Sequence, residues 1–138
     1  MALVTGACRQ NNGDIDFLYG SWALTGYTVD GETPADFEPD LTFFSFQNSI
    51  VRVSIVDDHH SFMARWGTWT RDDKVMTFDF GHSDDFTPAG TGAYAPPLWI
   101  GISEADVRME IVSRDGKDMT MMYNAPDAVR VYTLKKTW

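Results

Sequence analysis

Short segments in which apolar and polar residues alternate follow one another along this chain, with turn residues between them. The clearest lies at 107–113, where Val107, Met109 and Ile111 alternate with polar side chains. A period of two residues is that of a β-strand with one buried face. No helix of useful length is expected beyond a short turn near the N-terminus. The pattern therefore predicts an all-β fold.

Turn signals set the order of the expected strands. Asp115-Gly116 is the strongest of them, because both central positions of a type I′ turn need positive φ. Residues 31–40 and 81–97, rich in Pro, Gly and acidic side chains, are expected to be loops. Successive hairpins favour an up-and-down antiparallel meander barrel of eight to nine strands over a sandwich. The expected strands are about 21–29, 41–47, 50–56, 61–70, 74–80, 107–113, 119–123 and 129–135, with a short strand or bend at 99–102.

The length of 138 residues fits one domain. We expect residues 1–13 to be a signal remnant or flexible tether and residues 14–138 to form the barrel. The net charge of −9 argues against nucleic acid, because neutralising phosphates needs clustered Lys and Arg. It also argues against attachment to anionic lipid through a basic patch. No apolar run approaches the roughly 20 residues of a membrane span.

The single cysteine, Cys8, follows the small residues Gly6 and Ala7 and precedes a polar stretch. This arrangement resembles the end of a bacterial lipoprotein signal, in which such a cysteine is lipidated after cleavage. The resemblance implies removal of residues 1–7 and a lipid anchor at Cys8. It also implies an extracytoplasmic protein, periplasmic or anchored to the outer membrane of a Gram-negative bacterium. An ordinary N-terminal tail is the alternative.

A Gly-x-Trp triplet, Gly20 to Trp22, follows a short helical turn that Asp14 can cap. This opening resembles that of the lipocalins and their calycin relatives, in which the turn closes one end of the barrel. In that family an Arg of the last strand stacks across the Trp, which implies that Arg130 closes the barrel against Trp22. A guanidinium over an indole combines cation–π attraction with hydrogen bonds to carbonyls.

The resemblance extends over roughly residues 14–136 to short lipocalin-like domains of bacterial envelope lipoproteins. It is carried further by Gly67-Thr68-Trp69, by Trp99 after the long loop, and by the ending Tyr132-Thr133-Leu134-Lys135-Lys136. It implies a barrel that binds a small molecule and needs no cofactor. We expect no counterpart of the C-terminal helix usual in lipocalins within these residues.

The alternation also selects the side chains that would face the barrel interior. A barrel of eight strands is either filled by its own side chains or holds one small ligand. Val51 and Val53 are expected to face inward, and Tyr132 and Arg52 are candidates to orient a ligand. The predicted ligand-binding residues are Phe44, Phe46, Trp66, Phe78, Met109, Met121 and Tyr132.

The long loop at 81–97 carries Phe86 and Tyr94, which would contact a ligand if the loop acted as a lid. The alternative is a surface loop held by local turns. His59, His60 and His82 lie among aspartates, but we interpret them as solvated turn residues and expect no metal, because a metal needs three or four ligands in fixed geometry.

Signals for catalysis are weak, and we expect no enzyme. The sequence contains no nucleophile elbow, phosphate-binding loop or dinucleotide fingerprint. The carboxylates cluster in turns, and Asp79 and Glu110 are the strand-interior candidates for acid–base chemistry.

Two hypotheses for function follow. In the first, the domain is an extracytoplasmic binding module that holds a small apolar or amphipathic ligand inside the barrel. In the second, it is a non-enzymatic envelope protein-interaction module with a solidly packed barrel that docks through its loops. The volume inside the barrel separates them.

Overall fold

The computed structural model describes residues 17–56, 62–80, 93–94 and 96–137. These residues form strands and a single 3₁₀ helix, η2 (Leu98–Ile100). No helix in this part of the chain is long and apolar enough to cross a membrane. The strands are β1 (Gly20–Val29), β2 (Thr42–Gln47), β3 (Ile50–Val56), β4 (Phe62–Asp72), β5 (Val75–Asp79), β6 (Ala93–Tyr94), β7 (Asp106–Asp115), β8 (Asp118–Asn124) and β9 (Val129–Lys136).

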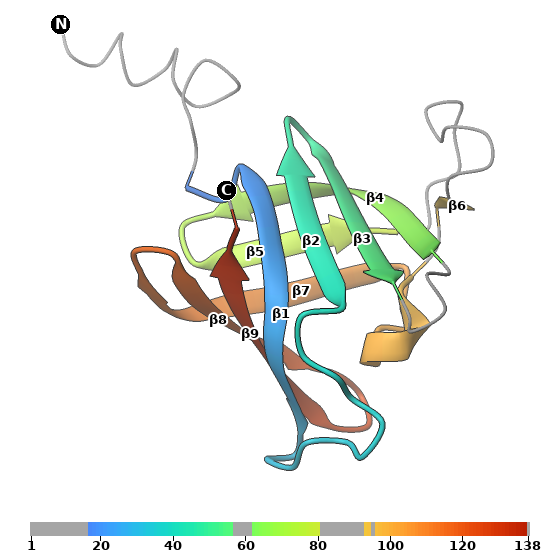
Figure 1. Ribbon diagram of the computed structural model, residues 1–138. Coiled ribbons are helices and arrows are strands. Elements are labelled where there is room, and N and C mark those ends of the chain that lie inside the picture. Colours follow the sequence, from blue (N-terminus) through green and yellow to red (C-terminus); the bar gives the residue numbers. More distant parts are fainter. Residues whose placement is uncertain (1–16, 57–61, 81–92, 95, 138) are drawn as a thin grey trace, which may run out of the picture.

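The sheet closes on itself as an eight-stranded barrel. Each long strand pairs antiparallel with the next along the chain, and β9 returns to pair with β1. Figure 1 shows the strands wrapping around one interior. The short β6 is an addition, paired parallel to β4 at Arg65↔Ala93 and Trp66↔Tyr94. The predicted all-β meander barrel is confirmed.

Two local predictions differ from the structure. The β7–β8 hairpin exists, but Asp115 pairs with Asp118, so Gly116 and Lys117 are the central turn residues. Of these two, only Gly116 has positive φ, 63°. A glycine at the first central position is the requirement of a type II′ turn. The expected strand or bend at 99–102 is instead η2 followed by Gly101.

The core follows the predicted alternation along most strands. On β8, Met119, Met121 and Tyr123 are buried between exposed or half-buried neighbours. Paired residues of neighbouring strands share a face, so burial of one row positions the next. Apolar burial on this face, at roughly 25 cal/mol per Å², is the main term that stabilises the barrel.

A β-bulge interrupts this alternation in β7. Ile111 pairs with Met121 and Ser113 with Thr120, so Val112 is an extra residue on β7. Val112 is 47% exposed. After the bulge the faces are exchanged, and Arg114 pairs with Met119, which is buried inside the barrel. The bulge therefore places Arg114 on the inner face, whereas strict alternation would have placed it on the outer face.

The two ends of the barrel differ. We call one the hairpin end: it carries the turns at 48–49, 73–74 and 116–117, and there β1 begins and β9 ends. The other, the loop end, carries residues 30–41, the turn at 125–128, and η2. The β4–β5 and β7–β8 turns lie side by side at the hairpin end, on the left in Figure 1.

Candidate functional site

Six of the seven predicted ligand-binding residues lie inside the barrel. They are at most 2% exposed: Phe44, Phe46, Phe78, Met109, Met121 and Tyr132. Val51 and Val53 also face inward and are fully buried. The inward rows were therefore predicted correctly on every strand that contributes these residues.

These side chains fill the interior. Phe44, Phe78, Met121 and Tyr132 have no surface that a water-sized sphere can touch. Such a side chain borders neither solvent nor a void large enough for water. Their rings contact one another: the Phe44 centroid lies 6.5 Å from that of Tyr132, and the Phe46 centroid 6.2 Å from that of Phe78. Close packing of this kind is typical of protein cores.

The seventh residue, Trp66, was placed on the wrong face. It is half-buried and pairs with Arg52 of β3, whose guanidinium carbon lies 5.9 Å from the indole centroid. Both side chains lie on the outer face, because the adjacent pair, Val51 and Gly67, faces inward. A Cβ on Gly67 would lie 2.8 Å from the Phe80 ring, so the Phe80 ring occupies the space that a side chain at 67 would need.

The hairpin end is closed by Trp22, which is fully buried. Its indole Nε1 donates a hydrogen bond to the Leu18 carbonyl at 2.9 Å. Lys136 pairs with Trp22, and its Nζ lies 5.5 Å from the indole centroid and donates to the Phe17 carbonyl at 2.8 Å. Gly20 begins β1, one residue before the expected start of this strand.

The prediction that Arg130 stacks across Trp22 was wrong. Arg130 pairs with Val29, at the opposite end of β1. In the observed strand register, Lys136 is the cationic residue that pairs with Trp22. Its ammonium lies over the indole in place of the expected guanidinium.

Arg130 organises the loop end instead. Its Nη1 and Nη2 donate to the two carboxylate oxygens of Asp127, at 2.9 and 3.2 Å, and its Nε donates to the Tyr27 hydroxyl at 3.2 Å. The Tyr27 ring stacks on Tyr132, with 5.3 Å between centroids. Tyr132 in turn donates to the Ile100 carbonyl at 2.8 Å. This network fixes η2 to the barrel.

Burial raises the pKa of the Tyr132 phenol above its usual range. Burial, followed by a 2.6 Å hydrogen bond to Glu104, does the same for the pKa of Tyr123. Both phenols are therefore neutral at physiological pH and act as hydrogen-bond donors. Tyr132, expected to orient a ligand, is committed to a backbone carbonyl.

The Arg130–Asp127 pair makes stability depend on pH. The hydrogen bond from Arg130 lowers the pKa of the Asp127 carboxyl from its usual 3.8. A lowered pKa stabilises the fold at neutral pH, and this contribution disappears as the pH falls below 3.8 and through the lower folded-state value. We expect Asp127→Asn to melt below the parent at pH 7 and together with it in acid, measured by circular dichroism. A difference that persists in acid would contradict this assignment.

A surface pocket of about 420 Å³ lies at the hairpin end. It is lined by Phe17, Arg71, Asp73, Lys74, Ile111, Val112, Ser113 and Arg114. Sequence reasoning missed it, because the β7 alternation was followed only to Ser113. The available signal was Val112, an apolar residue at a position where alternation requires a polar one.

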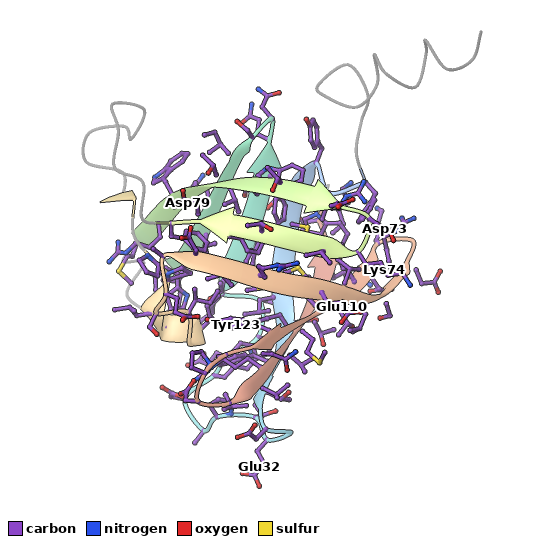
Figure 2. All side chains as sticks on the ribbon, turned by 180° about the vertical axis from the view of Figure 1, so that it is seen from behind. Glu32, Asp73, Lys74, Asp79, Glu110 and Tyr123 are labelled. Atoms are coloured by element: carbon purple, nitrogen blue, oxygen red, sulfur yellow. The ribbon has the colours of Figure 1, made fainter. Side chains whose placement is uncertain are left out.

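The remaining candidates contribute less to a described site. Asp79 and Glu110 lie on the outer face, on β5 and β7 (Figure 2). Within the described residues, no three His, Cys, Asp or Glu side chains gather as a metal site would require. Cys8, Asp14, Phe86 and the three histidines lie outside those residues, as does the side chain of Tyr94, so these predictions stay untested.

Solved structures share this fold. A lipocalin-like protein from Bacteroides uniformis ATCC 8492 superposes with a TM-score of 0.61 at 12% identity, covering 86% of this chain and 97% of its own. An uncharacterized protein from Bacteroides eggerthii DSM 20697 gives 0.58 at 13% identity, covering 86% and 98%. No family model matches the chain, and no curated protein matches it. The fold is therefore lipocalin-like.

Proposed function

We propose that this chain is a non-enzymatic binding module that uses its filled barrel as a rigid scaffold and recognises its partner on the outside. The observation that carries the proposal is the full burial of the interior side chains, with no surface left for a ligand on Phe44, Phe78, Met121 or Tyr132. The lipocalin-like fold favours binding over catalysis by analogy. Of the two hypotheses drawn from the sequence, the proposal corresponds to the second, in which the barrel is solidly packed.

The polar contacts inside the barrel support the same conclusion. The Tyr132 hydroxyl is bonded to the Ile100 carbonyl, and the Trp22 indole to the Leu18 carbonyl. A ligand-binding cavity needs a few polar groups that point into open space and fix the orientation of the ligand. Here these two buried donors already serve the protein's own backbone. Binding inside the barrel would require both repacking and the loss of such bonds.

Titration with N-phenyl-1-naphthylamine, a neutral apolar fluorophore, tests the proposal. We expect no saturable rise in its fluorescence with the parent protein, because the described side chains of the interior are buried against one another. Met121→Ala removes a fully buried side chain from the interior and leaves a cavity. Met121→Ala is the positive control, tested with a smaller apolar probe, benzene, by nuclear magnetic resonance.

Saturable binding of the neutral fluorophore to the parent, abolished by filling the interior with Val51→Phe, would overturn the proposal. It would restore the alternative of a ligand held inside the barrel. The lipid anchor at Cys8 and the envelope location stay predictions and do not bear on this titration.

A further inference from the structure

Cationic side chains gather on the inner rim of the hairpin end. Arg71 pairs with Met76, and Arg114 pairs with Met119. Both methionines are buried inside the barrel, so the two arginines occupy inner-face positions, each beyond the last apolar residue of its row. A strand pattern alone would leave Arg114 outside, but the bulge at Val112 brings it in.

Both guanidinium groups are held around one aromatic ring. The guanidinium carbon of Arg114 lies 4.1 Å from the Phe17 centroid, and that of Arg71 lies 4.8 Å from it. Arg71 is oriented further by a 2.7 Å hydrogen bond from Nη1 to the Asp73 carbonyl. The two cations are therefore positioned before any ligand arrives, which lowers the entropic cost of binding.

The pocket has an excess of positive charge. Its lining contains Arg71, Lys74 and Arg114 against the single carboxylate of Asp73. Figure 2 shows Asp73 and Lys74 at the β4–β5 turn, beside the β7–β8 hairpin. The whole chain has a net charge of −9, with 11 Lys and Arg in total. Three cations in one pocket repel one another, and a bound anion reduces that repulsion.

The rest of the lining is suited to an apolar body. The Phe17 ring, Ile111 and the exposed Val112 provide apolar surface, and Ser113 adds a hydroxyl. The volume of 420 Å³ falls in the range of small-molecule pockets, roughly 300–1,000 Å³. A fork of guanidinium donors binds oxygens of a carboxylate, sulfonate or phosphate in the same geometry.

We propose that this pocket binds a small organic anion, with its charged group on Arg71 and Arg114 and its apolar body against Phe17 and Val112. The inference rests on the proposed function, because it places recognition at the rim of the hairpin end and not in the filled interior of the barrel. It names the site, between the β4–β5 and β7–β8 hairpins, and the chemical class of the ligand.

A matched pair of fluorophores tests it. 8-Anilinonaphthalene-1-sulfonate carries the rings of N-phenyl-1-naphthylamine plus one sulfonate. We expect the sulfonate to bind the parent saturably, with one site and with affinity that falls as salt increases. Arg71→Gln and Arg114→Gln should each raise its dissociation constant about tenfold or more, since each removes a charged hydrogen bond.

Two further variants keep the result decisive. Ser113→Asp adds a negative charge to the pocket while both arginines remain on Phe17, and should also raise the dissociation constant about tenfold. Arg108→Gln removes an exposed cation from β7 that is not part of the lining, and should leave binding unchanged. Circular dichroism melting of each variant confirms that it is folded.

The outcomes separate this inference from the proposed function. Three results overturn the anion site. They are a loss of affinity for the sulfonate with Arg108→Gln equal to that of the pocket variants, an unchanged affinity with Ser113→Asp, and the absence of sulfonate binding to the parent. Failure of both fluorophores to bind the parent overturns the site but leaves the packed-barrel proposal standing. Saturable binding of the neutral fluorophore inside the barrel overturns the proposed function, whatever the arginine variants show.

Discussion

Replacing Trp22 with alanine is expected to lower the free energy of unfolding by about 3–5 kcal/mol, the range for removal of a fully buried Trp. The change empties the hairpin end of the barrel and removes the donor to the Leu18 carbonyl. It also deprives Lys136 of the indole face that its ammonium contacts. Urea titration followed by circular dichroism measures the effect without relying on tryptophan fluorescence.

Trp66→Ala is the matched control, because it removes the same atoms from a half-buried position on the outer face. We expect a clearly smaller loss, about 1–2 kcal/mol, since less apolar surface is removed from water on folding there. Equal losses at the two positions would contradict the role of Trp22 as the closure of the barrel.

Gly101→Ala should lower the free energy of unfolding by roughly 2–5 kcal/mol through backbone strain and overpacking combined. Gly101 has a backbone φ of 77°, a value that residues other than glycine rarely adopt. A Cβ there would clash with Arg130 Nε and would lie 2.5 Å from the Tyr27 hydroxyl. The substitution therefore displaces the network that fixes η2. Urea titration measures the loss.

Gly31→Ala isolates the two causes. Gly31 also has positive φ, 88°, but a Cβ there would meet no atom within 4 Å. In this variant only the backbone strain at positive φ should matter, and the free energy of unfolding should fall by about 1–2 kcal/mol. If the two substitutions lower the free energy of unfolding equally, the expected clash of a Cβ at position 101 with Arg130 has no energetic cost, and the overpacking argument is wrong.

The alternation of the sequence predicted the barrel because each hairpin is local. On β8 one phase buries Met119, Met121 and Tyr123, and on β7 one phase buries the large apolar residues before the bulge, so the inner face could be chosen there without knowledge of the partner strands. On β4 two phases compete, since Trp66 and Trp69 are three residues apart and must face opposite sides of a strand. The inward position of Gly67 is explained by Phe80, the residue that follows β5, whose ring packs on Gly67 of β4. This contact joins residues that are 13 positions apart, so the alternation of β4 alone could not show it.

The pairing register of strands that are distant in the chain could not be predicted from the sequence. Arg130 and Lys136 both occupy inner-face positions of β9, and either could have faced Trp22 by alternation alone. A bulge between Leu24 and Gly26 helps set how β1 aligns with β9, and it places Lys136 across from Trp22. The pocket was missed for the same reason, because the bulge at Val112 moves Arg114 to the inner face without a local turn signal.

Closure of the barrel by β1 and β9 also constrains the order of folding during synthesis. Ser21 and Thr137, which are hydrogen-bonded neighbours, are 116 positions apart in the chain. After β1 is synthesised, it must therefore wait for β9 before Trp22 is covered. Such non-local pairing carries a large loop-closure entropy and slows folding. Until β9 emerges, the nascent chain presents an unpaired β1 edge, which is open to pairing with other chains.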